Sequence, residues 1–122
     1  MNKPTLHYDE VSDTLYISYE PGTPATGIEL NEHILLRIDS QREKAIGLTL
    51  FDYSVLAQPT DLGPRSFPLT GLASLSHDLR ERVIKLLRSP PVSETLVLSA
   101  YTPSAVETIP IILLHPVLAE TA

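Results

Sequence analysis

The sequence predicts an α+β fold, in which a small antiparallel β-sheet packs against one main helix. Short runs in the first part of the chain alternate apolar and polar residues, as half-buried strands do, and a later run carries apolar residues at helical spacing. At 122 residues, a single domain over 1–122 is expected, because a chain of this length buries roughly two-thirds of its unfolded surface. We expect a four-stranded meander within 5–54, a helical segment at 72–89 and further strands at 92–116.

The first expected element is a β-hairpin over residues 6–19. Leu15, Ile17 and Tyr19 fall on one face because strand side chains alternate. The segment 9–14 between the two strands is polar, and its Asp and Ser side chains can accept hydrogen bonds from nearby backbone N–H groups. The hairpin is therefore expected to supply the first apolar patch of the core.

Two more strands are expected after residues 20–27, whose two prolines and two glycines predict irregular structure. They run over about 34–38 and 45–51, with a polar turn at 39–44 between them. The residues expected on their core side are Ile34, Leu36, Ile38, Ile46, Leu48 and Leu50. A sheet with one apolar face needs a cover on that face.

The expected cover is a helix that begins after Ser76 and ends before Pro90-Pro91. The Ser76 hydroxyl can accept from an unpaired N–H group of the first turn, and the prolines stop the helix. Its apolar arc consists of Leu79, Val83, Leu86 and Leu87. The segment 58–71 before the helix is interpreted as a connection.

The basic residues of this helix are expected to form a solvated face. They are Arg80, Arg82, Lys85 and Arg88. Two pairs with the acid four residues ahead of the base, Asp78 with Arg82 and Glu81 with Lys85, are expected to stabilise the helix.

Two further strands are predicted over 95–101 and 109–114. Pro110 lacks a backbone donor, which places the last strand at a sheet edge or starts it after Pro110. The run 111–114 is apolar without alternation, so both of its faces are expected to be covered. We hypothesise a homodimer with this strand at or near the interface; whether these strands join the first sheet or an interface stays open at this point.

Composition limits the partners and the compartment. A formal charge of −6 repels polyanions, so nucleic acid is not an expected partner. The absence of cysteine rules out disulfides and thiol chemistry, and together with an N-terminus that lacks an apolar leader it fits a cytoplasmic location. The longest apolar run, 111–114, is far too short to span a bilayer, so no membrane segment is expected.

No residue is predicted to be catalytic, cofactor-binding or metal-binding, and no cofactor is expected. Asp9, Glu10 and Asp13 share one loop and offer oxygen ligands to a hard cation, but the loop lacks the glycine and the closing acid of an EF-hand. Capping of the loop is the favoured interpretation. The four histidines are scattered without metal-site spacing, and no serine has the glycine-flanked setting of a hydrolase nucleophile.

The sheet face opposite the apolar one is a candidate partner-binding face. Strand alternation places on it His7, Tyr16, Ser18, Arg37 and Phe51. Aromatic residues and arginine are favoured where proteins meet, since they bury large areas and keep a polar group. The competing interpretation is an ordinary wet face of an antiparallel sheet.

A family resemblance covers residues 5–54. It rests on Tyr8-Asp9, Asp13, Leu15-Tyr16-Ile17, Glu29-Leu30, Ile34, Ile38-Asp39, Ile46-Gly47-Leu48, Leu50 and Ser54. These residues resemble the small bacterial family known as domain of unknown function 2283, which has no established activity. The resemblance implies a short protein of the partner-binding kind, such as an antitoxin that neutralises a toxin-like protein. The chain departs from the family pattern at the turn 40–44, which lacks the usual glycine, and beyond Ser54.

The function predicted from the sequence is a non-enzymatic protein-interaction or oligomerisation module, antitoxin-like in its finer form. Its expected partner is a second copy in a homodimer or a small protein. The alternative is a small-ligand or metal-binding domain, which could be an enzyme, with its site between the sheet and the connection 58–71. A convergent catalytic set would favour the alternative, and the sequence offers none.

Overall fold

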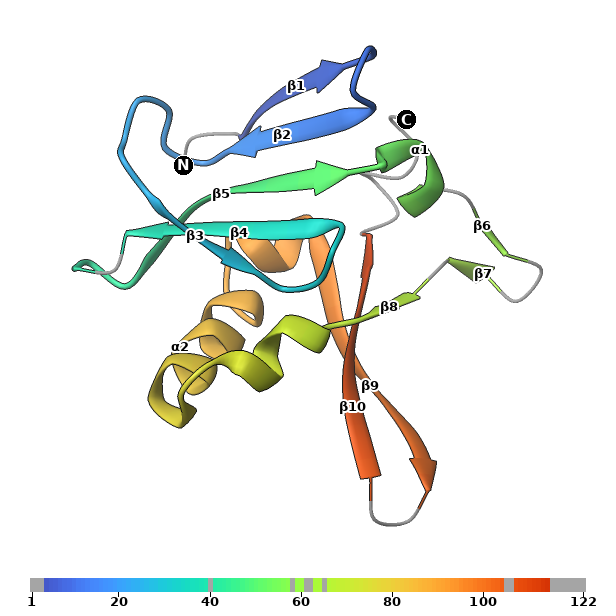
Figure 1. Cartoon of the computed structure of the whole chain (residues 1–122). Helices are drawn as coiled ribbons and strands as arrows, with labels where there is room; N and C mark the ends of the chain where they lie inside the picture. Colours follow the sequence, from blue (N-terminus) through green and yellow to red (C-terminus); the bar gives the residue numbers. More distant parts are fainter. Residues whose placement is uncertain are drawn as a thin grey trace.

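The computed structural model describes residues 4–39, 41–57, 59–60, 63–64, 66–104 and 107–114. These ranges form a five-stranded antiparallel sheet, a three-stranded sheet, a short strand pair and one main helix (Figure 1). The five-stranded sheet consists of β1 (Thr5–Asp9), β2 (Thr14–Ser18), β3 (Thr26–Glu29), β4 (Ile34–Asp39) and β5 (Lys44–Phe51). The helices are α1 (Tyr53–Leu56), α2 (His77–Leu87) and the 3₁₀ turns η1 (Thr70–Ser74) and η2 (Val92–Glu94). The predicted α+β class is confirmed.

The strand order is β1-β2-β5-β4-β3, which differs from the predicted meander. β5 lies between β2 and β4, with Leu48 opposite both Ile17 and Leu36. β3 forms the far edge and includes Thr26 and Gly27, the end of the segment predicted to be irregular. The three consecutive strands β3, β4 and β5 thus fold back so that β5 meets β2, a Greek-key arrangement. The physical reason is burial, because β5 has buried residues at every position from 45 to 50 and gains most from a central place.

The core lies on one face of this sheet. Its cluster joins sheet residues to residues of α2, η2 and β9 (Leu96–Ser104), among them Leu15, Ile17, Leu36, Leu48, Leu50, Val83, Leu87, Val92 and Leu96. A register shift in the β4–β5 pairing sets Ala45 opposite Ile38 and Gly47 opposite Arg37. The predicted core-side position of Ile46 is therefore wrong. The β-bulge gives that position to Ala45, and Ile46 is buried but lies outside the core cluster.

Helix α2 forms where predicted. The Ser76 hydroxyl accepts a hydrogen bond from the Leu79 amide at 3.3 Å, as expected of an N-cap. Val83 and Leu87 are buried, whereas Leu79 and Leu86 are half-buried at the margin of the core. The arc read from the sequence is thus the face that packs on the sheet.

Three of the four residues of the predicted basic face, Arg82, Lys85 and Arg88, are exposed as predicted, whereas Arg80 is half-buried. Arg80 Nε donates to the Leu72 carbonyl at 3.0 Å, and its Nη2 donates to the Leu75 carbonyl at 3.3 Å. Arg82 Nε lies 3.2 Å from a Glu43 carboxylate oxygen in the β4–β5 turn. Among the described residues, neither predicted pair on the helix forms an ion pair. Arg82 pairs with Glu43 instead, and Lys85 pairs with no described acid.

The C-terminal strands form their own sheet and do not join the first one. β10 (Glu107–Leu114) lies between β9 and β8 (Ser66–Pro68), and β6 (Pro59–Thr60) pairs with β7 (Gly63–Pro64). Ile112 lies opposite Leu98 of β9 and Phe67 of β8, so the predicted edge position is wrong for this part of the strand. Pro110 lies one residue before β10 begins to pair with β8. Its missing N–H group therefore interrupts no hydrogen bond between these two strands. Among the described residues, no helix is long and apolar enough to cross a membrane.

Candidate interaction face

The sheet face opposite the core brings together the five residues predicted for partner binding, and we call it the open face. Cross-strand pairing sets them in neighbouring rows. One row is His7, Tyr16 and Thr49; the next is Ser18, Gly47 and Arg37; Phe51 lies opposite Thr14. The open face spans strands β1, β2, β5 and β4, and helix α2 packs on the other side of the sheet (Figure 1). Its residues are placed as expected, whereas their role in partner binding stays a prediction.

Arg37 projects from β4 on the open face, and its guanidinium lies over Gly47 of the neighbouring strand β5. A Cβ atom built on Gly47 would be only 2.4 Å from Arg37 Nη2, so the glycine leaves the room that this side chain occupies. Arg37 Nε is buried without a hydrogen-bond partner, and Arg37 forms no ion pair with another described residue. A fixed cation without an internal acceptor favours an acceptor supplied from outside.

Exposed aromatic side chains accompany Arg37. Tyr16 is 42% exposed and Phe51 is 40% exposed. The His7 and Tyr16 rings stack with centroids 6.1 Å apart and planes 27° apart. The sheet holds the backbone that carries these rings, so a partner that covers them restricts mainly their side-chain torsions.

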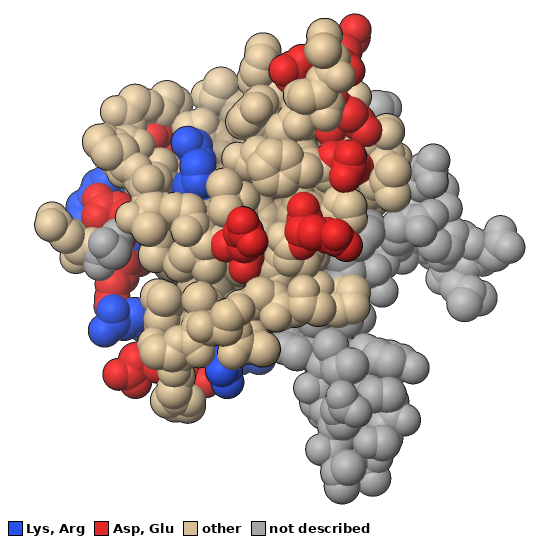
Figure 2. Space-filling model, viewed as in Figure 1, with Lys and Arg blue, Asp and Glu red and all other residues tan. Residues whose placement is uncertain are grey.

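One end of the sheet is acidic. The strand ends and turns at this end carry Asp9, Glu10, Asp13, Glu29, Glu32 and Asp52. Figure 2 shows acidic side chains at the upper right, over the turn that joins β1 and β2. His33 lies among them, with Nδ1 3.1 Å from an Asp52 carboxylate oxygen. The field at this end opposes a partner's carboxylate, whereas Arg37 favours one.

The acid at the centre of this end, Asp13, is held by hydrogen bonds. Its carboxylate accepts from the Ser54 hydroxyl at 2.6 Å, from the Ser54 amide at 3.1 Å and from the Tyr8 hydroxyl at 2.7 Å. These bonds, Ser54 first, lower the pKa of Asp13, and the bond to Asp13 raises the pKa of Tyr8 to about 12. Asp13 has φ 52°, a conformation that Asp tolerates better than most residues. Its backbone carbonyl accepts from the Tyr53 amide, so Asp13 joins the first turn to α1.

The oxygen atoms of this loop are therefore largely engaged in capping. Asp9 Oδ1 accepts from the Val11 amide at 3.0 Å, which is the capping interpretation of the loop. Within the described ranges, no group of three or more His, Asp or Glu side chains is arranged to hold a metal ion. The ligand site predicted beside 58–71 stays a prediction, because residues 58, 61, 62 and 65 of this connection lie outside the described ranges.

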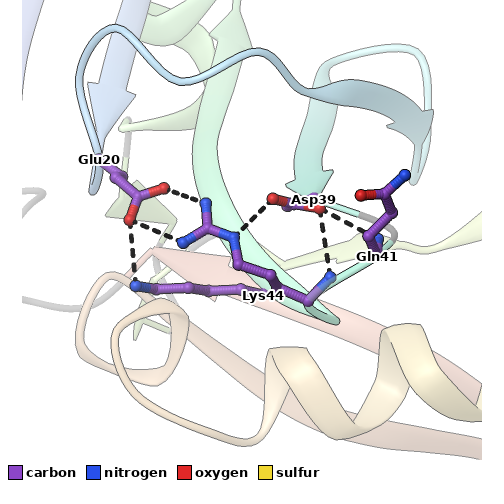
Figure 3. A network of polar contacts seen from close by, with 5 residues as sticks. Glu20, Asp39, Gln41 and Lys44 are labelled. Carbon is purple, nitrogen blue, oxygen red and sulfur yellow. Dashed lines mark hydrogen bonds and ion pairs between the residues drawn. The ribbon is translucent and has the colours of Figure 1, made fainter.

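The opposite end of the sheet is held by an ionic network (Figure 3). Arg42 pairs with Glu20 and, at 2.6 Å, with Asp39, while Lys44 Nζ lies 3.2 Å from Glu20. The Arg42 guanidinium, then Thr23 and Lys44, lower the pKa of Glu20 to about 2. This network holds the β4–β5 turn, in which Glu43 takes the left-handed position at φ 50° without a glycine.

Residues 5–54 match the profile of a family described as a protein of unknown function (DUF2283). The match confirms the resemblance over that segment, which forms the five-stranded sheet and the start of α1. No curated protein and no solved structure matches the chain.

The structure gives roles to several residues that carry the resemblance. Tyr8, Asp13 and Ser54 form one hydrogen-bonded cluster, and Gly47 makes room for Arg37. From the sequence, Ser54 counts only as one of the residues that carry the resemblance, and neither arrangement was predicted. The signal lay in the co-occurrence of these residues in the pattern, but the contacts depend on pairing between β2, β4 and β5.

Proposed function

We propose that this chain is a non-enzymatic interaction module that binds another protein through the open face. The observation that carries the proposal is Arg37, a positioned cation that no described residue neutralises, on the same sheet face as exposed Tyr16 and Phe51. Arginine and tyrosine are the residue types that most often dominate binding energy at protein interfaces. A catalytic role would need a convergent set of acid, base and nucleophile, and the open face offers none among its described residues.

The partner chemistry that fits this face is an apolar surface that carries a carboxylate. The carboxylate neutralises Arg37, and apolar groups cover Tyr16 and Phe51. A second copy of this chain and a different small protein are the two sources of such a surface. The finer form of the proposal, an antitoxin-like role toward a small toxin, rests on the family resemblance over residues 5–54.

The test is a double variant, Tyr16→Ala with Arg37→Ala, in a tagged chain expressed in its own source. We expect the variant to lose the polypeptide that the parent chain retains on affinity purification, while its free energy of unfolding changes by no more than about 0.5 kcal/mol. The control is Val11→Ala with Arg88→Ala, which also removes one apolar and one basic side chain, at exposed sites away from the open face. Equal retention in both variants, or a large loss of stability in the first, would refute the proposal.

A further inference from the structure

A surface groove lies between the β4–β5 turn and the second half of α2, on the core side of the sheet and thus away from the open face. Its main cavity measures about 310 Å³, at the lower end of the range for small-molecule sites. The cavity is lined by Glu43, Lys44, Ala45, Arg82, Lys85, Leu86, Ser89, Pro90 and Pro91. A second cavity of about 30 Å³ shares Glu43, Arg82 and Leu86 with the first and is also lined by Ile38, Leu79 and Val83. The Glu43–Arg82 ion pair, at 3.2 Å, ties the two walls together.

The lining of the cavity combines apolar residues with basic ones. Ala45 is buried, Leu86 is half-buried, and the two prolines add apolar surface. Three cations line the cavity against one carboxylate, in a chain whose overall charge is −6. Lys44 is engaged with Glu20 and Arg82 with Glu43, whereas Lys85 forms no ion pair with another described residue. One positive charge is therefore left over in the groove.

The C-terminal end of α2 would ordinarily oppose an anion here, because its last carbonyl groups carry partial negative charge. Several of these carbonyls are already used. The Lys85 carbonyl accepts from the Ser89 hydroxyl at 2.7 Å, and the carbonyls of Ile84 and Leu86 accept from the amides of Arg88 and Ser89. Their engagement weakens the opposing field beside the Lys85 ammonium.

We propose that the groove binds a small organic monoanion, a carboxylate with an apolar body. The carboxylate pairs with Lys85, and the body covers Ala45, Leu86 and the prolines. One unpaired cation matches one negative charge, and the apolar part of the lining favours a ligand that has more than a charged group. This site is independent of the open face and gives the chain a ligand-binding capacity beside its proposed partner binding.

An NMR titration of the uniformly ¹⁵N-labelled full chain with sodium benzoate tests the proposal. We expect saturable shifts of the amides of Lys85, Leu86, Ser89 and Ala45. Benzyl alcohol, which lacks the charge, and inorganic phosphate, which lacks the apolar body, are expected to bind more weakly. Lys85→Met is expected to weaken benzoate binding about fivefold, the effect of one exposed ion pair.

The matched control is Arg88→Met, which removes the same charge from the same end of α2 at a residue that does not line the cavity. It is expected to leave benzoate binding within about twofold of the parent chain, because an exposed charge that does not contact the ligand contributes little to binding. Absence of saturable shifts, equal weakening by the two variants, or equal binding of benzyl alcohol would overturn the proposal. Equal binding of phosphate would overturn its apolar part.

Discussion

Replacement of Gly47 by alanine tests the geometry beneath Arg37. The added Cβ atom would lie 2.4 Å from Arg37 Nη2 and 2.5 Å from the Ile17 carbonyl oxygen, where ordinary contacts begin at 3.4 Å. The guanidinium can shift, but the carbonyl belongs to β2, whose pairing with β5 holds the sheet together. An overlap of this kind in a packed interior costs about 1–3 kcal/mol. For a chain of this size, that lowers the melting temperature by about 4–12 °C.

The assay is urea unfolding followed by circular dichroism, with Gly27→Ala as the matched control. At Gly27 the nearest atom to the new Cβ is Leu35 Cδ1 at 3.2 Å, the mobile end of a side chain, so the change should stay within about 0.5 kcal/mol. In an Arg37→Ala background, Gly47→Ala should cost less, because one of its two overlaps is removed. Equal stability of Gly47→Ala and Gly27→Ala would refute the close packing of Arg37 over β5.

Three further predictions concern the core, the ionic network and the Asp13 cluster. In urea unfolding, Leu87→Ala should lower the free energy of unfolding by about 3 kcal/mol and Leu86→Ala by about 1 kcal/mol, because Leu87 is buried and Leu86 is only half-buried. Equal losses would mean that α2 packs on the sheet with a different face. The folded-state pKa of Glu20 is depressed from 4.5 to about 2, so its contribution to stability is full above pH 4.5 and is lost as the pH falls toward 2. Glu20→Gln should therefore reduce the fall in the free energy of unfolding between pH 4.5 and pH 2, and an unchanged fall would contradict the network. Asp13→Asn should lower the pKa of Tyr8 from about 12 toward 10.0, which is measured as the difference between the tyrosinate absorbance titrations of the variant and the parent chain. Superimposable titrations would contradict the hydrogen bond between Tyr8 and Asp13.

Local patterns predicted the local elements well. The hairpin through Leu15 and Ile17 and the helix after Ser76 depend on periodicity and capping within a few residues. Strand order depends on contacts between distant segments. Alternation in β2, β4 and β5 is compatible with several neighbours. The burial of every residue from 45 to 50, which marks a central strand, arises only in the folded sheet and does not follow from the alternation.

The candidate site shows the same division. Alternation alone placed Tyr16 and Arg37 on one face, because the facing direction of a residue does not depend on which strand lies beside it. The position of Arg37 over Gly47 depends on the pairing of β4 with β5. The hydrogen bond from Ser54 to Asp13 depends on how the chain after β5 meets the turn between β1 and β2. Neither contact could be read from spacing.

Native mass spectrometry of the tagged chain, purified gently from its own source, tests most directly the claim that this protein is an interaction module. We expect a mass larger than 13.4 kDa plus the tag, by either a second copy or a second polypeptide, and loss of that extra mass in the Tyr16→Ala, Arg37→Ala variant. A bare monomer at micromolar concentration, or an assembly that the variant retains in full, would contradict the proposal that the open face binds a protein.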